Sequence, residues 1–307
     1  MKEPGIAVCI PTYKRIDLLT EAINSCLAQT HLPQEILIGD NSPDTNTQQA
    51  VEAIAQAAVV PIRYYHHVPG LGQAPNVDFL FSHVQSEFLL LLHDDDTIER
   101  DCIAAMLACF KEHPDVDVLF GKQYVMSNEG VIDHAVSVQT NETFYRTPAY
   151  AGSKLAGLEA AIVQQFPNDC YAVKTELAKR IRYKGKTNHA CDFEFALALG
   201  LANAKTFFLD RYTASYRLSA DALSKQNDNN GSFIIYQLVE PLQVPASSQH
   251  YQQKVLKEKA PVAVAQAARL KHRREAVRIL FSKWHRSKLF TSTGAKGFYH
   301  VLKSFVS

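Results

Sequence analysis

Three consecutive carboxylates, Asp94, Asp95 and Asp96, follow the apolar run 88–92. Two unit charges about 4 Å apart repel each other by roughly 4 kcal/mol at an effective dielectric constant near 20, so water or a cation must relieve the repulsion. Mg²⁺ and Mn²⁺ prefer oxygen ligands, and Mg²⁺ is commonly bound by one or two carboxylates together with substrate phosphates. Two interpretations stay open: a divalent-metal site, or a solvated acidic turn before a helix that we expect near Asp101.

Two further acids form a second candidate site. Asp192 and Glu194 stand at the start of the segment 191–202, whose apolar residues predict an amphipathic helix. Acids at a helix start are often favoured by the helix dipole, and the functional alternative is a general base that faces a pocket. Arg217 also has two interpretations, because its guanidinium could bind a phosphate or pair with a surface acid.

Alternating strands and helices must position these residues. Short apolar runs predict strands at 6–10, 35–39, 62–66 and 87–92, and helical spacing separates them. This order predicts an α/β fold with a mostly parallel sheet covered on both faces. Ligands of such sheets lie beyond the carboxyl ends of the strands. The polar residues that follow the first, second and fourth strands should therefore share one rim: Thr12, Arg15, the run 40–44 and the run 94–96.

Composition excludes several classes of protein. With 307 residues, 47% hydrophobic and 21% charged, the chain has the length of about two domains and fits neither disorder nor a fibrous repeat. No apolar run approaches the roughly 20 residues of a membrane span, and the N-terminal run is too short for a signal peptide. The six cysteines form no CxxC pair, which argues against a zinc site or a disulfide framework. We therefore expect a cytoplasmic protein.

The charge is divided unequally along the chain. Residues 254–307 contain 13 Lys and Arg against 2 acids, a net charge of +11, whereas residues 1–253 have a net charge of −10. Basic and apolar residues alternate between 269 and 289, with one Trp and few acids, as in an interfacial amphipathic helix. We predict that this tail docks on an anionic membrane surface. The alternative is that its apolar residues pack on the body or on a second subunit. Nucleic acid is not expected, because no recognition module accompanies the charge.

Three short motifs follow one another at spacings of about 30 and 50 residues: Val8-Cys9-Ile10-Pro11-Thr12-Tyr13-Lys14-Arg15, Ile38-Gly39-Asp40-Asn41-Ser42 and Leu92-His93-Asp94-Asp95-Asp96. Their order and spacings resemble those of glycosyltransferase family 2. Later motifs of the family are resembled by Cys191-Asp192, Tyr216-Arg217 and Leu223-Ser224, so that the resemblance covers about residues 5–225.

The resemblance implies a GT-A (Rossmann-like) fold, a mostly parallel sheet flanked by helices. We expect three parts. Residues 1–120 would form the nucleotide-sugar-binding half of the GT-A domain and residues 121–245 its acceptor-binding half. Residues 246–307 would form a basic, helical C-terminal extension.

The resemblance also assigns roles to matching residues. Thr12, Arg15 and Asp40 would hold the base and ribose, with Asp40 accepting from the imide N–H of the base. Asp95 matches the metal-ligating acid of the DXD motif, and Asp192 matches the catalytic base, with Glu194 in reserve. The full set comprises Pro11, Thr12, Arg15, Asp40, Asn41, Asn76 and Asp94 for the nucleotide, Asp95 and Asp96 for the metal, and Arg217 and Ser219 for a diphosphate or acceptor contact.

Three positions depart from the family pattern. His93 occupies the first position of the DXD motif, and Ser219 stands where many members carry a His that helps hold the metal or diphosphate. Cys191 replaces the usual Glu beside the base. The departures at His93 and Ser219 affect the predicted metal or diphosphate contact, and the one at Cys191 affects the assignment of the catalytic base.

The resemblance implies an inverting, metal-dependent transferase. It would use Mn²⁺ or Mg²⁺ and move a sugar from a nucleotide-diphosphate donor, UDP-sugar favoured, to a glycan or lipid-linked acceptor, in cell-surface polysaccharide synthesis. One alternative is a sugar-nucleotide nucleotidyltransferase, but that class usually has a glycine-rich loop after its first strand, and residues 11–15 contain no glycine. The other is a non-catalytic sugar-nucleotide-binding protein.

Overall fold

The computed structural model describes residues 4–184, 190–219 and 230–306. The chain forms two compact units, residues 1–220 and 221–307, which are described separately. The boundary expected at residue 246 lies inside the second unit. The expected halves 1–120 and 121–245 contribute strands to a single sheet in the first unit.

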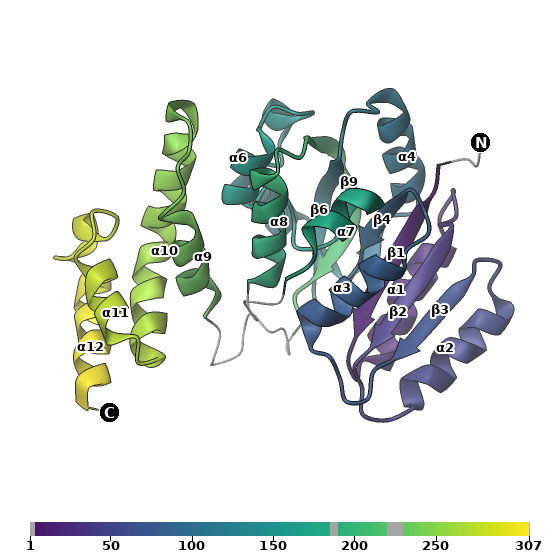
Figure 1. Cartoon of the computed structure of the whole chain (residues 1–307), viewed down its shortest axis with the longest axis horizontal. Coiled ribbons are helices and arrows are strands. Elements are labelled where there is room, and N and C mark those ends of the chain that lie inside the picture. The colour runs from purple at the N-terminus through teal and green to yellow at the C-terminus, as the bar shows by residue number, and fades with distance from the viewer. Residues whose placement is uncertain (1–3, 185–189, 220–229, 307) are drawn as a thin grey trace. The chain divides into compact units, whose positions relative to one another are not determined.

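That sheet has nine strands among the described residues, in the order β3-β2-β1-β4-β8-β6-β9-β5, with β7 paired to β6 (Figure 1). The pairs β3–β2, β2–β1, β1–β4 and β6–β9 are parallel, and β8 is antiparallel to both of its neighbours. The mostly parallel α/β sheet expected from the sequence is confirmed. The strands are β1 Ile6–Thr12, β2 Glu35–Asp40, β3 Ile62–His66, β4 Phe88–Leu91, β5 Thr97–Ile98, β6 Val118–Met126, β7 Ile132–Asp133, β8 Tyr171–Lys174 and β9 Thr206–Arg217.

Helices cover both faces of this sheet. In β1, Ile6, Val8 and Ile10 pack into one apolar layer with α1, α2 and α4, while Ala7 and Cys9 pack into the other layer with α3, α7 and α8. A strand buried on both faces must be apolar at consecutive positions, which explains the continuous apolar run. The helices are α1 Ile16–Leu27, α2 Asn46–Ala57, α3 Gln73–His83, α4 Cys102–Glu112, α5 His134–Thr143, α6 Gly157–Ile162, α7 Thr175–Ile181 and α8 Cys191–Leu201, with a 3₁₀ turn η1 Pro148–Tyr150.

Helix α8 carries the second candidate site. Its bounds agree with the predicted segment 191–202, but it is not amphipathic, because apolar residues all round it are buried. A Cβ on Gly200 would lie 2.7 Å from the Cα of Leu158, so the glycine permits close packing on α6. Helix α8 is thus an interior element, and Asp192 enters the site from within the fold.

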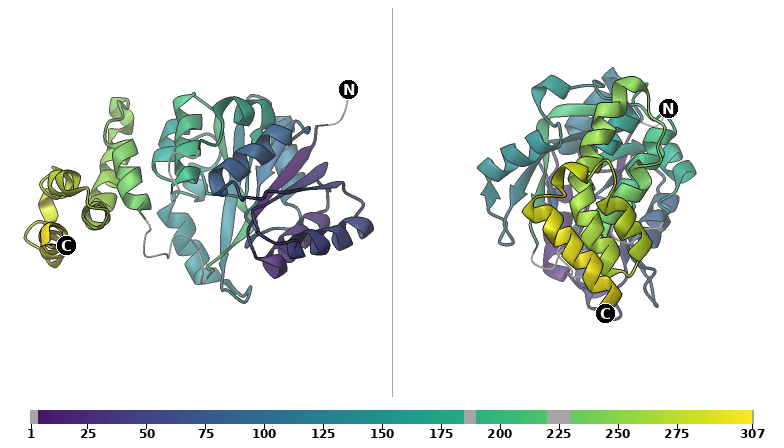
Figure 2. Two further views of the ribbon diagram at one scale, coloured as in Figure 1. Left: turned by 60° about the horizontal axis from the view of Figure 1, so that its bottom comes forward. Right: turned by 90° about the vertical axis from the view of Figure 1, so that its left-hand side faces the viewer.

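The second unit consists of helices packed around α10 (Figure 2). Leu256, Val264 and Leu280 are among its buried apolar residues. The helical C-terminal extension is confirmed. No described helix of either unit is both long and apolar enough to span a bilayer. The elements are α9 Gly231–Val239, η3 Ala246–Ser248, α10 Gln249–Arg269, α11 Arg273–Leu280, η4 Arg286–Lys288 and α12 Ser292–Val306.

Candidate active site

The rim of the sheet brings the first two polar clusters together. Strands β1 and β2 are parallel, and their last residues, Thr12 and Asp40, are register partners. The adjacent strand β4 ends at Leu91, immediately before the segment 93–96. The carboxyl ends of neighbouring parallel strands meet at one edge, which is where ligands of such sheets lie.

Asp94 and Asp95 are tied to the loop after β1. Arg15 Nη1 lies 3.2 Å from Asp94 Oδ1 and 2.9 Å from Asp95 Oδ2. The hydroxyl of Thr12 donates to Asp94 Oδ2 at 2.7 Å. Burial raises the pKa of Asp94, and the neighbouring Arg15 opposes that effect. Arg15 is therefore already engaged by the acidic segment, which relieves part of its charge repulsion.

Asp40 is fully buried at the end of β2. Its Oδ1 accepts from the backbone N–H of Ser42 at 2.7 Å, and its Oδ2 accepts from the Tyr64 hydroxyl at 2.5 Å. Burial, together with Asp40, raises the pKa of Tyr64. Tyr64 on β3 was not anticipated from the sequence. Both oxygens of Asp40 therefore already accept hydrogen bonds from within the protein.

Asn41 and Asn76 bind backbone groups of the rim. The Asn41 side chain donates to the carbonyl of Gly72 at 3.1 Å and accepts from the N–H of Leu71 at 2.9 Å. Asn76 Nδ2 donates to the carbonyl of Gly39 at 2.6 Å. Both amides fasten the loop 68–75 to the end of β2. The third predicted residue, Pro11, lies within β1 and has no N–H to offer.

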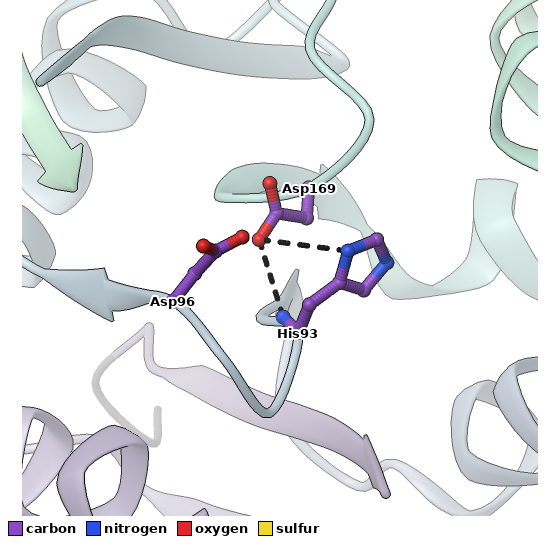
Figure 3. A group of neighbouring side chains, drawn as sticks. All are labelled: His93, Asp96 and Asp169. Carbon is purple, nitrogen blue, oxygen red and sulfur yellow. Dashed lines mark hydrogen bonds and ion pairs between the residues drawn. The ribbon is translucent and has the colours of Figure 1, made fainter. Parts of the chain in front are cut away.

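A compact cluster lies beneath the acidic segment (Figure 3). One potential ligand atom from each of His93, Asp96 and Asp169 lies within 4.8 Å of the others. The backbone N–H of His93 donates to Asp169 Oδ2 at 3.2 Å, and His93 Nδ1 lies 4.0 Å from the same oxygen. Asp96 Oδ2 is buried and has no hydrogen-bond partner among the described residues, and the Asp96 carboxylate points toward that of Asp169. Of the two acids predicted to bind metal, only Asp96 belongs to this cluster.

The cluster concentrates negative charge in a buried place. Burial raises the pKa of Asp96 well above its ordinary value, and Asp169 and Asp95 raise it further. For His93, burial acts to lower the pKa, but Asp169 and Asp192 outweigh it and the net direction is upward. A shared proton or a hard cation would relieve the carboxylate pair. The two carboxylates supply the oxygen donors that Mn²⁺ and Mg²⁺ prefer, whereas the imidazole is a better ligand for metals such as Zn²⁺ and Fe²⁺.

Arg217 and Ser219 hold the acidic segment from β9 and the residues that follow it. The backbone N–H of Arg217 donates to Asp96 Oδ1 at 2.6 Å, and its Nε donates to the carbonyl of Asp95 at 2.8 Å. Its guanidinium also pairs with Glu21, and the side chain is buried. Ser219 donates to Asp95 Oδ2 at 2.7 Å. The hydrogen bonds of Arg217 thus stabilise the acidic segment 94–96, whereas Ser219 contacts Asp95, a predicted metal ligand, directly. Leu223-Ser224, the last motif of the resemblance, lies outside the described residues.

Asp192 reaches the same cluster from the first turn of α8. Its Oδ1 accepts from the Tyr183 hydroxyl and lies 3.9 Å from His93 Nε2. Burial raises the pKa of Asp192, and His93 and Tyr183 oppose that effect. Glu194 stands two positions further along the helix, and residues at i and i+2 do not share a face. The structure therefore brings Asp192, and not the reserve residue Glu194, beside His93.

Sequence reasoning missed Asp169 and Tyr183. Asp169 immediately precedes Cys170, whose N–H donates to the carbonyl of Leu91 at the end of β4. That antiparallel pairing between β4 and β8 places Asp169 opposite the acidic segment, although 73 positions separate it from Asp96. The only signal in the sequence was an acid just before a short apolar run, which is too common to single out.

The chain belongs to glycosyl transferase family 2, whose model matches residues 7–163, just over half of the sequence. Abequosyltransferase RfbV of Salmonella typhimurium is 27% identical over 113 residues, which cover 36% of this chain and 34% of that protein. An uncharacterized glycosyltransferase of Nostoc sp. is 28% identical over 131 residues, covering 42% of this chain and 40% of that protein. The chain thus matches well under half the length of these relatives.

Solved structures share the fold. Staphylococcus aureus TarS 1–349 in complex with UDP-GlcNAc aligns with a TM-score of 0.68 at 18% identity, covering 98% of this chain and 89% of that one. A mannosyltransferase from Pyrobaculum calidifontis in complex with GDP-Man and Mn²⁺ aligns with a TM-score of 0.63 at 16% identity, covering 99% and 88%. The GT-A fold expected from the sequence is therefore confirmed.

Proposed function

We propose that this protein is an inverting glycosyltransferase that moves a sugar from a nucleotide-diphosphate donor, UDP-sugar favoured, to a hydroxyl of a glycan or lipid-linked acceptor. The observation that carries the proposal is that two groups of acids from distant parts of the chain meet around His93. One group, residues 94–96, follows β4, and the other, Asp192, opens α8. Inverting transfer needs a donor site and a base on opposite sides of the anomeric carbon.

The donor binds at the rim of β1, β2 and β4. Thr12 and Arg15, which contact Asp94, form the side of the site nearest β1, and Asp40 recognises the base at the end of β2. Asn41, Asn76 and Pro11 shape the loop over the nucleotide. The UDP-GlcNAc complex of a protein with the same fold supports a UDP-sugar donor.

A divalent cation, Mn²⁺ or Mg²⁺, would be held by Asp95 and Asp96, with Asp169 as a further carboxylate. The unpartnered Asp96 Oδ2 in a buried acidic pair and the Mn²⁺ of the mannosyltransferase complex support this assignment. Such an ion supplies Lewis-acid stabilisation for the leaving diphosphate. Ser219 orients the Asp95 carboxylate, and Arg217 fixes the backbone of the segment.

Asp192 takes the proton from the acceptor hydroxyl as that oxygen attacks. A general base contributes typically 10²–10⁴-fold to the rate. Tyr183 donates to one oxygen of Asp192, which leaves the other oxygen for the acceptor. A raised pKa makes Asp192 a stronger base than an ordinary aspartate, and the neighbouring His93 favours its ionised form.

We further propose a role in cell-surface polysaccharide synthesis; the abequosyltransferase relative, which by its name also transfers a sugar, supports the transferase class. A lipid-linked acceptor would lie at a membrane, so we place the enzyme in the cytoplasm, peripherally on the inner face of the cell membrane. The basic second unit, rather than a membrane span, would provide that contact.

Donor turnover tests the proposal. The purified protein is incubated with UDP-, GDP- and dTDP-sugars with and without Mn²⁺, and the released product is identified. Release of nucleoside diphosphate supports a transferase, whereas formation of nucleoside triphosphate and sugar 1-phosphate only when pyrophosphate is added would assign a nucleotidyltransferase. A thermal-shift screen of the same nucleotides reports binding separately, because binding raises the apparent stability. Nucleotide binding without any turnover would contradict the enzymatic proposal and indicate a binding protein.

A further inference from the structure

Helix α12 exposes its large apolar side chains and buries its small ones. Gly294, Gly297, Val301 and Ser304 lie on the face that packs against the rest of the second unit. The adjoining face carries an outer stripe at spacings of three, four and seven residues, which align along one side of a helix. The outer stripe consists of Phe298 (38% exposed), Tyr299 (60%), Leu302 (66%) and Phe305 (56%).

The exposure of the stripe follows from the packing of the buried face. A Cβ on Gly297 would lie 2.9 Å from Leu280 Cδ1 and 3.6 Å from Val264 Cγ1, so a larger residue at this position would require the Leu280 side chain to shift. Glycine thus favours close packing of α12, and the large residues of the stripe remain mostly at the surface. A helix of a soluble protein normally has the reverse arrangement, and contiguous exposed apolar side chains indicate an interaction surface.

The stripe lies outside the segment 269–289, in which basic and apolar residues alternate. Ile279 and Leu280 of that segment are buried inside the helical unit and are therefore not available to contact a membrane. Phe281, in contrast, is 58% exposed and packs its ring edge-to-face on Phe298, with centroids 5.8 Å apart. It extends the outer stripe onto the end of α11.

A basic groove adjoins the stripe. It has a volume of about 800 Å³ and is bounded by the residues before and within α11 and by Phe305 of the stripe. Arg273 lies between the two features, since its guanidinium is 5.2 Å from the Phe305 ring and its Nε donates to the carbonyl of Ser304. The acid in the groove, Glu275, is paired with Arg278. The groove is lined by Lys271, His272, Arg273, Arg274, Glu275, Val277 and Phe305.

We propose that the outer stripe and the basic groove form one docking face for a bilayer that contains anionic phospholipid. The stripe enters the boundary between headgroups and acyl chains, and the groove receives a lipid phosphate. This inference rests on the proposed function, because it brings the enzyme to a lipid-linked acceptor. Residues 271–307 contain nine Lys and Arg and one acid. Two copies meeting through this face would oppose like charges, and a nucleic acid would leave the apolar stripe uncovered.

Vesicle co-sedimentation of the full-length protein tests the docking face. Vesicles of phosphatidylcholine alone are compared with vesicles that also contain phosphatidylglycerol, at low and high salt. We expect at least about tenfold stronger partitioning onto the anionic vesicles. Tyr299→Ser with Leu302→Ser removes apolar area, and Lys271→Gln with Arg274→Gln removes charge. Each pair should lower partitioning onto anionic vesicles by about tenfold or more.

Matched controls lie on the first unit. Val59→Ser removes an apolar side chain that is 88% exposed, and Lys154→Gln removes an exposed charge there. Both should partition as the wild type does. Circular dichroism confirms that each variant folds. Donor hydrolysis of every variant is measured in the absence of vesicles and should be unchanged, so that failure of the catalytic proposal is seen separately.

Several outcomes would overturn the proposal. One is equal binding of the wild type to neutral and anionic vesicles, or no binding at all. Another is partitioning that responds to the charge variant but not to Tyr299→Ser with Leu302→Ser, which would indicate binding to any polyanion, RNA included. A third is self-association in light scattering that the same apolar variant abolishes while vesicle binding persists, which would assign the stripe to a second copy.

Discussion

His93 Nε2 lies 3.9 Å from Asp192 Oδ1, and this short separation joins the rim of the sheet to the start of α8. The resemblance to the family places His93 at the first position of the DXD motif, where a carboxylate is usual. A carboxylate at that position would repel Asp169 and Asp192, whereas a protonated imidazole between them attracts both, which raises the pKa of His93. The substitution therefore changes the electrostatics of the base as well as those of the donor site.

Asp192→Asn should bind donor normally and lose transfer by at least about a hundredfold, the lower end of a general-base contribution. The amide keeps the size of the side chain but cannot accept a proton. Initial rates with saturating donor measure the loss, and calorimetric titration of the nucleotide measures binding. Glu194→Gln is the matched control, because it neutralises an acid on the same helix that faces elsewhere. Near-normal turnover of Asp192→Asn would move the base to another residue.

The rate of transfer should fall at acidic pH with an apparent pKa above that of an ordinary aspartate. Asp192 must be ionised to accept a proton, and burial raises its pKa, so protonation inactivates it as the pH falls through that raised value. The Tyr183 hydroxyl stabilises the ionised form. Tyr183→Phe should therefore raise the pKa of Asp192 and move the acidic limb of the kcat profile to higher pH.

Tyr171→Phe is the control for that profile. The Tyr171 hydroxyl is buried nearby and has no hydrogen-bond partner among the described residues. Its removal should leave the acidic limb almost in place. Equal shifts in the two variants, or a limb that Tyr183→Phe does not move, would mean that the limb reports another group.

Local patterns in the sequence were sufficient for the strands β1 to β4 and the rim that they form, but they did not predict β5 to β9. The apolar run of β1 indicated a strand buried on both faces, and the polar residues after β1, β2 and β4 meet because parallel strands end at one edge. The order of the three short motifs indicated the GT-A fold. These features depend on neighbours in the sequence, which is why a pattern can predict them.

Asp169 and Tyr183, the two site residues that were missed, could not be predicted in the same way. Asp169 reaches Asp96 through the antiparallel pairing of β8 with β4, and Tyr183 reaches Asp192 across a segment that includes residues 185–189, outside the described part of the chain. The exposed stripe of α12 was missed for a related reason. Helical periodicity shows that a helix has an apolar face, but only packing shows which face is covered.

Asp95→Ala should abolish transfer and remove the effect of Mn²⁺ on nucleotide binding. Asp95 is only partly buried, with 14% of its side chain exposed, and it is held by Arg15 and Ser219 at the rim. Thermal shifts with UDP, with and without EDTA, check the metal effect, and donor hydrolysis checks turnover. Asp101→Ala removes an exposed acid paired with Arg211 and should change neither. Nucleotide binding that ignores EDTA in the wild type would contradict the metal assignment.

Asp169→Asn should change how folding stability depends on pH. Burial and Asp169 raise the pKa of Asp96 in the folded protein, so the folded state binds more protons than the unfolded state above pH about 3.9. The free energy of unfolding then falls as the pH rises from that value to the raised pKa of Asp96. Asp169→Asn removes one cause of the shift, and the fall should become smaller.

Urea unfolding at acidic and neutral pH, with and without Mn²⁺, distinguishes a shared proton from a metal ion at this pair. If Asp96 and Asp169 both bind Mn²⁺, the ion restores the stability of the wild type at neutral pH and does so much less in Asp169→Asn. Glu142→Gln, an exposed acid on α5, serves as the control and should behave as the wild type does. An equal response of Asp169→Asn and the wild type to Mn²⁺ would exclude Asp169 as a ligand, while a difference in pH dependence alone would assign the pair to proton sharing.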